Sequence, residues 1–517
     1  MRHWVSIRHH FFFNGYFPAL SQLKKLASQT AVYGLSTILG RLLNYLLVPL
    51  HTRVFGTADY GVVSELYAYS SFFIVTLTYG METAFFRFSQ DEEKKDKVFP
   101  TAFLSICVTS LVFMLCMGAF AQPVANAIHY PDHPEYIIYF ALILGLDAIA
   151  SIPFALLRGQ SRPAKFAVVK NVNIVSNVFL NLYFLMLCPY MLRESNISLP
   201  FYRENVGVGY VFISNLAASI ITLPLLCKEI VRIKKGFDAA LWRKMAAYGL
   251  PLLVVGLGGM VNETLDRAIM KYLLPAGSGT LSQVGIYGAN YKLSILMSLF
   301  IQAFRFAAEP FFFSHAKTSD KKAIYARVMD YFVLVCLGIF LLVTLYIDLF
   351  KYFIGSSFHE GLKVVPVLLL ANLCLGIYYN LSIWYKLSDQ TRKGAMISLI
   401  GAGITIGLNI WWIPLFGYTG SAWATFICYF SMMLICYFMG MKYYPIPYHV
   451  KRVLGFAGVA GALFSIGWYC RNFFCAGGLV RTLCINSALF LFFVVAVCIF
   501  IKKDRIHPVA QGFSRDE

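Results

Sequence analysis

The sequence predicts an all-helical integral membrane protein with about fourteen transmembrane helices. Of its 517 residues, 59% are hydrophobic and only 13% are charged, whereas a soluble protein of this size would carry roughly a quarter charged residues. Apolar runs of about twenty residues, each long enough to cross a hydrocarbon core as a helix, recur from Ala31 to Ile501. These runs centre near Leu42, Phe73, Val112, Leu144, Val178, Ile220, Val255, Leu299, Val335, Leu369, Ile404, Phe426, Ala460 and Phe492.

The positive net charge is a topology signal rather than the mark of a nucleic-acid partner. The chain carries 44 Lys and Arg against 25 Asp and Glu, a formal net charge of +19. When the connections are assigned alternately to the two sides of the membrane, 32 of these cations fall on the side that holds both termini and 8 on the other. Because cytoplasmic loops carry an excess of Lys and Arg, we expect both termini in the cytoplasm.

The connections between the apolar runs leave little room for catalysis. The longest outer ones, near Gln122–Glu135 and Cys188–Gly207, have about the length of ordinary connectors or slightly more. The cysteines lie mostly inside apolar runs, and no Cys or His spacing is typical of a metal site. We therefore expect a protein that is not an enzyme and that holds no metal and no cofactor.

A faint internal repeat divides the chain into two halves of six helices each. The matched segments are Tyr33-Gly34-Leu35 with Tyr248-Gly249-Leu250, Gly61 and Tyr67 with Gly285 and Tyr291, and Gln160-Ser161-Arg162 with Gln390-Thr391-Arg392. An even number of helices orients both halves alike, so a pseudo-twofold axis along the membrane normal relates them.

The repeat sets the expected domain boundaries. We predict an N-lobe over residues 28–235, a C-lobe over 236–445, an additional helix pair over 446–503 and a cytoplasmic tail over 504–517. Residues 1–27 are aromatic and basic but lack a long apolar core and a cleavage site, and they predict a cytoplasmic or interfacial arm.

Short motifs in both halves resemble those of one transporter family. They are Pro49-Leu50-His51-Thr52-Arg53, Asp59-Tyr60-Gly61 and Gly80-Met81-Glu82-Thr83-Ala84 in the first half, and Asp266-Arg267 and Val284-Gly285-Ile286-Tyr287 in the second. In this order they resemble the Wzx-type polysaccharide flippases of the multidrug/oligosaccharidyl-lipid/polysaccharide exporter superfamily. The resemblance covers nearly the whole chain from about Leu23 onward.

The resemblance implies two six-helix lobes around a central cavity that opens alternately to each side. It implies transport of an undecaprenyl-pyrophosphate-linked oligosaccharide to the outer leaflet of the bacterial cytoplasmic membrane, for O-antigen, capsule or exopolysaccharide synthesis. The expected partners are this lipid-linked oligosaccharide, membrane lipids and other polysaccharide assembly proteins.

Cations inside the spans are the candidate substrate-binding groups. A pyrophosphate cannot cross hydrocarbon unaided, and a charged residue within a membrane helix is a functional candidate by default. Arg41 and Arg305 lie too deep to reach the surface easily, and we predict that they contact the head group together with Arg267 and Lys292. Two further cations, Arg53 and Lys271, lie near helix ends and are expected to reach the surface.

Acidic residues in the same helices are candidates for gating or ion coupling. The repeat places Glu82 level with Arg305, and it places Glu65 one turn from the level of Lys292. We hypothesise that these two pairs form alternately at the two gates. The remaining candidates are Glu263, Asp266 and Asp147, which could bind protons or sodium; a local Glu263–Arg267 pair and a purely structural Asp147 are the alternatives.

Other functions of related chemistry stay open at this point. A lipid II flippase fits the same resemblance. A drug or cation antiporter of the same superfamily is less favoured, because cationic drugs need an acidic cavity. A membrane glycan polymerase would need catalytic groups in a sizeable outer loop.

Overall fold

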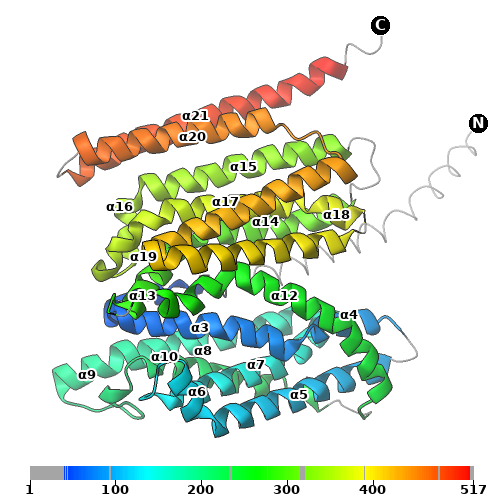
Figure 1. Cartoon of the computed structure of the whole chain (residues 1–517), viewed down its shortest axis with the longest axis vertical. Coiled ribbons are helices and arrows are strands. Elements are labelled where there is room, and N and C mark those ends of the chain that lie inside the picture. Colours follow the sequence, from blue (N-terminus) through cyan, green and yellow to red (C-terminus); the bar gives the residue numbers. More distant parts are fainter. Residues whose placement is uncertain are drawn as a thin grey trace, which may run out of the picture. The chain divides into compact units, whose positions relative to one another are not determined.

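The computed structural model describes residues 40, 42–43, 45–91, 95–231, 236–275, 277–314, 321–388, 390–474 and 478–512 (Figure 1). Within these ranges the regular structure is helical and contains no strand. The predicted N-terminal arm and the end of the predicted tail lie outside the described residues.

The membrane spans follow the predicted apolar runs. Among the described residues, ten helices are long and apolar enough to cross a membrane, or eleven if the bent pair α13 and α14 is one span. Every predicted run from Phe73 to Phe492 lies within a described helix, whereas the run near Leu42 lies mostly outside the described residues. The prediction of an all-helical, multi-pass membrane protein is confirmed.

Contacts between elements divide the chain into two units. Unit 1 includes Phe72–Val254, and unit 2 includes Val48–Ser71 together with the chain from Val255 onward. One division falls between Leu47 and Val48, and the other two fall inside the long helices α3 (Thr57–Thr78) and α12 (Ala239–Leu273). The predicted lobes follow the sequence repeat instead, and their boundaries stay predictions.

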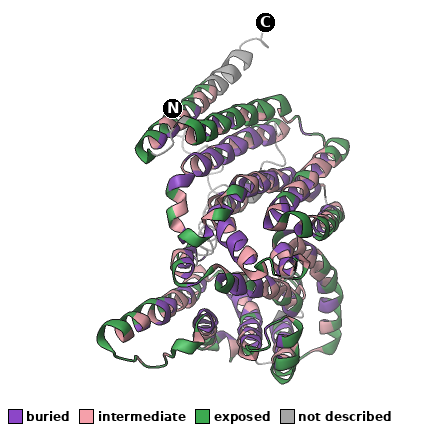
Figure 2. Cartoon of the chain, turned by 60° about the vertical axis from the view of Figure 1, so that its left-hand side comes forward, coloured by how far each residue is buried: buried purple, intermediate pink, exposed green. Residues whose placement is uncertain are grey.

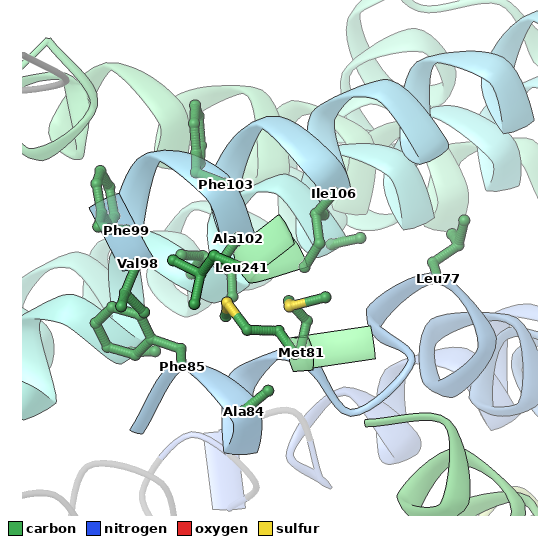
Figure 3. Close-up of a cluster of buried hydrophobic side chains, with 14 of the residues drawn as sticks. Leu77, Met81, Ala84, Phe85, Val98, Phe99, Ala102, Phe103, Ile106 and Leu241 are labelled. Atoms are coloured by element: carbon green, nitrogen blue, oxygen red, sulfur yellow. The ribbon is translucent and has the colours of Figure 1, made fainter. Parts of the chain in front are cut away.

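Unit 1 is built around a core of interlocking apolar side chains. Its other helices are α4 (Met81–Phe88), α5 (Lys95–Ala119), α6 (Ala121–Ala127), α7 (Pro134–Gly159), α8 (Pro163–Leu182), α9 (Cys188–Ser195), α10 (Gly209–Leu225) and α11 (Cys227–Ile230). Figure 3 shows Met81, Phe85, Phe99 and Ile106 packed together, with Leu241 of α12 among them. Because lipid tails are as apolar as these side chains, the cluster stabilises the unit through close packing rather than through the hydrophobic effect.

Unit 2 contains a sharply bent pair of helices and one interrupted helix. It comprises α2 (Leu47–Val54, from Val48), α13 (Thr280–Leu293), α14 (Ile295–Ser314), α15 (Lys321–Leu345), α16 (Ile347–Phe350), η3 (Lys351–Phe353), η4 (Ser356–Val364), α17 (Val365–Leu381), α18 (Ile383–Leu387), α19 (Thr391–Tyr443), α20 (Val450–Tyr469) and α21 (Leu479–Gly512). The helices α13 and α14 meet at a bend of 50°. The long helix α19 is interrupted at Gly417, whose φ of 59° is a left-handed conformation that favours glycine.

The helices α20 and α21 form the additional pair near the C-terminus. They run beside α15 (Figure 1), and most of their remaining surface is exposed (Figure 2). Many of the exposed side chains are large and apolar, among them Leu454, Ile466, Leu491 and Ile499. Such a surface suits contact with lipid.

Candidate functional site

Two glycines matched by the sequence repeat lie at a backbone contact between α3 and α13 in unit 2. A Cβ on Gly61 would lie 2.0 Å from the carbonyl oxygen of Leu281, and a Cβ on Gly285 would lie 1.9 Å from that of Thr57. The contact is reciprocal, because Thr57 and Leu281 stand four residues before Gly61 and Gly285. Only glycine permits so close an approach, so the first half of α3 crosses α13 at its narrowest point here.

The chain before α3 is also fixed to unit 2. The Thr52 hydroxyl accepts a hydrogen bond of 3.0 Å from the backbone N–H of Gly355, and Arg53 donates one of 2.6 Å to the carbonyl oxygen of Tyr352. Arg53 is exposed, as predicted. These contacts explain why Val48–Ser71 groups with unit 2 although it precedes unit 1 in the sequence.

Glu65 and Lys271 form a buried ion pair beside this crossing. Their charged atoms lie 3.4 Å apart, and the two side chains are 0% and 7% exposed. Tyr69 donates a 2.6 Å hydrogen bond to the second carboxylate oxygen of Glu65, and its hydroxyl lies 2.8 Å from that of Tyr272. The expectation that Lys271 reaches the surface is wrong, because a buried carboxylate on the neighbouring helix draws its ammonium group inward.

The candidate cation Arg267 lies in a second polar cluster. Its guanidinium lies 3.2 Å from the carboxylate of Asp266, which also accepts a 2.7 Å hydrogen bond from Tyr287. The guanidinium lies 4.4 Å from the ring centre of Tyr291. It contacts Glu263 through the backbone oxygen. The alternative of a Glu263–Arg267 side-chain pair is therefore replaced by an Asp266–Arg267 pair, while the carboxylate of Glu263 lies on an exposed residue.

The other candidate residues of unit 2 are placed separately. Arg305 lies in α14 with its guanidinium 4.0 Å from the ring centre of Tyr379. Lys292 is half-buried near the end of α13. Arg41 lies outside the described residues. The hypothesised pairing of Glu65 with Lys292 stays a prediction.

Unit 1 carries its own charged groups. Glu82 of α4 forms an ion pair of 2.6 Å with Arg158 of α7. Asp147, also on α7, accepts a 2.8 Å hydrogen bond from Ser219, and Lys170 of α8 is an electrostatic neighbour of Asp147. Asp147 and Lys170 are both accessible at the surface of unit 1. Because charged residues within membrane helices rarely face lipid, Asp147 and Lys170 mark a candidate polar surface of unit 1.

Sequence reasoning missed Lys271, Arg158 and Lys170 as site residues. Two of them, Arg158 and Lys170, lie within the helices α7 and α8. Proline at position 163 was the available signal, because it favours the first turn of a helix and therefore places Lys170 two turns inside one.

A model of the family described as "Polysaccharide biosynthesis protein" matches residues 26–316, more than half of the chain. The chain belongs to this family. A relative from Haemophilus influenzae, the "Lsg locus putative protein 1", is 21% identical over 441 residues, which cover 81% of this chain and 98% of the relative. The predicted membership of a polysaccharide transporter family is confirmed.

Solved structures of transporters share the fold. The lipid II flippase MurJ in an inward closed conformation matches with a TM-score of 0.69 and 14% identity, over 92% of this chain and 99% of that chain. An inward-facing multidrug resistance MATE transporter of the MOP superfamily matches with a TM-score of 0.61 and 12% identity, over 80% of this chain and 97% of that chain. The protein therefore has the fold of this superfamily of membrane transporters and flippases.

Proposed function

We propose that this protein is a flippase that moves an undecaprenyl-pyrophosphate-linked oligosaccharide across the bacterial cytoplasmic membrane by alternating access. The observation that carries the proposal is the combination of a polysaccharide biosynthesis family with a flippase fold over 92% of the chain. The reaction is transport without covalent chemistry, and both termini lie in the cytoplasm.

The cations within the spans support binding of a pyrophosphate. Moving a doubly charged head group into hydrocarbon is prohibitively costly, so a carrier must replace its lost hydration with charged hydrogen bonds. Arg305 rests against Tyr379, and an aromatic face holds a guanidinium without neutralising its charge. In this proposal Arg305 binds the pyrophosphate together with Arg41 and Lys292.

Arg267 has a different electrostatic setting from Arg305. The neighbouring carboxylate of Asp266 already offsets its charge, and Tyr291 covers one side. We propose that Arg267 contributes less than Arg305 to binding of the pyrophosphate. We assign Asp266 and Glu263 to the ion-coupling step. Asp147, which is accessible and bonded to Ser219, is a second candidate for binding a coupling proton or sodium ion.

The crossing of α3 and α13 is the proposed gate. Gly61 and Gly285 bring the two backbones into contact, and the Glu65–Lys271 pair lies next to them. By the predicted topology this crossing is on the outer side. A substrate that leaves outward requires this contact to separate, which also exposes the buried ion pair to water.

Transport of a defined substrate tests the proposal. A short synthetic undecaprenyl-pyrophosphate oligosaccharide is placed in the inner leaflet of proteoliposomes, and its appearance outside is followed for wild type, Arg41→Ala and Arg305→Ala. We expect each variant to lose at least about tenfold in rate, because one charge-assisted contact to phosphate is worth about 1.5–3 kcal/mol. The exposed Arg193→Ala in α9 serves as the control and should transport normally. Unimpaired transport by both variants would contradict the assignment of these arginines.

A lipid II flippase is the second candidate, and the fold match to MurJ is the observation that favours it. Competition separates the two functions. Unlabelled lipid II should inhibit transport of the labelled oligosaccharide only weakly if the proposal is right, and it should be the preferred substrate if the second candidate is right.

A further inference from the structure

Two neighbouring cavities in unit 2 share the side chains of Glu360 and Lys363. One has a volume of about 920 Å³ and is mainly apolar; the other has a volume of about 410 Å³ and is the more polar of the two. Both lie at connections that the predicted topology places on the outer side. Neither cavity contains a candidate residue of the transport site described above.

The apolar cavity runs along one face of α20. Small residues at Ala457, Gly461 and Ser465 leave a space between α20 and the side chains of Val367 and Leu370 on α17. The lining continues along α20 to Trp468, about 16 Å from Ala457 at 1.5 Å per residue, and on to Asn472 in the following π-helical turn η5 (Cys470–Phe474). A cavity of this length and composition fits a hydrocarbon chain.

Cations gather where the apolar cavity ends. Lys363 and Arg471 both line it. Arg471 lies 3.0 Å from Asp348, and Lys351 lies 2.9 Å from the same carboxylate oxygen, so two cations share one acid. The side chains of Lys363 and Glu360 are 56% and 67% exposed and lie 3.8 Å apart. An exposed pair of this kind is worth at most about 1 kcal/mol, so Lys363 can turn toward an anion at little cost.

The polar cavity lies on the other side of Lys363. Hydroxyl and amide groups line it, from Ser278, Ser282, Gln283 and Thr419. Two aromatic residues, Phe416 and Tyr418, complete the lining. The hydroxyl of Tyr418 donates a 2.9 Å hydrogen bond to Glu360, and the ammonium of Lys363 lies 5.1 Å from the centre of its ring. The exposed ring of Phe416, with hydroxyl and amide groups around it, suits a sugar.

Gly417 gives this cavity its shape. The residue has a left-handed φ of 59°, and a Cβ there would lie 2.4 Å from the side-chain oxygen of Gln283. Glycine is therefore required for the break in α19 that sets Phe416 and Tyr418 beside α13. The sugar-sized cavity is a consequence of this break.

We propose that the two cavities together form a docking site for a lipid-linked saccharide in the outer leaflet. The part of the lipid chain next to the head group occupies the apolar cavity, its phosphate contacts Lys363 and Arg471, and the sugar occupies the polar cavity. The choice of occupant rests on the proposed function. An ordinary phospholipid would fill the apolar cavity and the cationic mouth but would leave the polar cavity unused.

Photolabelling of the full-length protein in nanodiscs tests the docking site. The probe is a benzophenone-bearing farnesyl-pyrophosphate disaccharide. We expect Gly461→Leu, which fills the apolar cavity, and Lys363→Glu to weaken binding by about tenfold each. Gly455→Leu is the matched control, because Gly455 is on the same helix, its Cβ also points into open space, and it does not line the cavity. Its binding should equal that of wild type.

The polar cavity needs a test of its own. Ser282→Trp should reduce affinity for the disaccharide probe to that for the same probe without sugar, and it should leave the sugar-free probe unaffected. Equal binding by Gly461→Leu and Gly455→Leu would overturn the proposal. Displacement of the disaccharide probe by phosphatidylglycerol at equal concentration, with Ser282→Trp behaving as wild type, would also overturn it and identify a phospholipid site.

Transport of the same probe separates this inference from the proposed function. If wild type flips the probe in proteoliposomes but labelling is insensitive to Gly461→Leu and Lys363→Glu, the docking site is wrong and the function stands. If labelling is sensitive to both substitutions but wild type flips no polyprenyl-linked saccharide, the proposed function is wrong and the saccharide site stands.

Discussion

Glu65 and Lys271 show how burial changes the meaning of an ion pair. Removing two charges from water costs several kcal/mol per ion, and mutual attraction offsets that cost only when both partners are present. The surrounding hydroxyls of Tyr69 and Tyr272 add hydrogen bonds to the same cluster. Each member therefore depends on the other, in contrast to pairs on the surface.

Removal of one partner should destabilise the protein much more than removal of both. We expect Lys271→Met to lower the free energy of unfolding by about 3–5 kcal/mol, because Glu65 is left buried without its cation. The double variant Glu65→Leu with Lys271→Met should recover most of this loss. Thermal unfolding in detergent measures both effects. Lys97→Met removes a far more exposed pair with Asp238 and should change stability by less than about 1 kcal/mol. Equal losses in the single and double variants would contradict a mutually dependent pair.

At the scale of elements, the contact between α3 and α13 follows from two glycines. The repeat predicted that Gly61 and Gly285 correspond to each other, but correspondence alone did not predict that they touch. Contact requires the two helices to cross at equivalent positions along their lengths, which depends on how α3 and α13 pack within unit 2. The existence of the spans, by contrast, was predictable, because an apolar run of about twenty residues is long enough to cross the membrane as a helix.

Adding a methyl group at this crossing should force the two helices apart. A Cβ at Gly285 would lie 1.9 Å from a backbone oxygen that no side-chain rotation can move. We expect Gly285→Ala to lower the free energy of unfolding by about 1–3 kcal/mol, measured by thermal unfolding. Gly403→Ala in α19 is the control, since its Cβ meets nothing within 4 Å, and it should be neutral or slightly stabilising. A neutral Gly285→Ala would show that the backbones are not in contact.

The carboxylate of Glu229 links the short helix α11 to the N-terminal end of α8. The side chain of Glu229 is 2% exposed and accepts hydrogen bonds from Arg162, at 2.8 Å, and from Lys165. Burial by itself raises the pKa of Glu229, but the hydrogen bonds and charges of Lys165 and Arg162 outweigh it and hold the pKa below its ordinary value of 4.5.

This depressed pKa predicts an acid-sensitive stability. The ionised carboxylate stabilises the folded state above the unfolded pKa of 4.5, and that contribution is lost as the pH falls through the lower folded pKa. Glu229→Gln should therefore lower the melting temperature at pH 7, and the difference from wild type should shrink as the pH is lowered through and below 4.5. Melting curves between pH 3.5 and 7 check this expectation. A constant difference across that range would show that ionisation of Glu229 is not responsible.

At the scale of the whole molecule, local rules predicted the spans and long-range contacts decided their grouping. The apolar runs predicted nearly every membrane-spanning helix, because a span in lipid must satisfy its own backbone hydrogen bonds. The division inside α3 and α12 was not predictable, since it depends on contacts such as that of Thr52 with Gly355, about 300 positions away. The same limit applies to the site. Burial of Lys271 was missed because its partner comes from a distant part of the sequence.

The hypothesised gating pair of Glu82 and Arg305 has a specific alternative, which is the pair of Glu82 with Arg158. In unit 1 Glu82 lies 2.6 Å from Arg158, and in unit 2 Arg305 rests on Tyr379. If Glu82 serves transport by pairing with Arg305 in another state, Glu82→Arg with Arg305→Glu should restore flipping lost in each single variant. If the pair with Arg158 is the one that matters, Glu82→Arg with Arg158→Glu should restore it instead. Alternating access permits Glu82 to pair with Arg158 in one state and with Arg305 in another. In that case neither double variant recovers fully, because the arginine introduced at position 82 meets a second arginine in one of the two states.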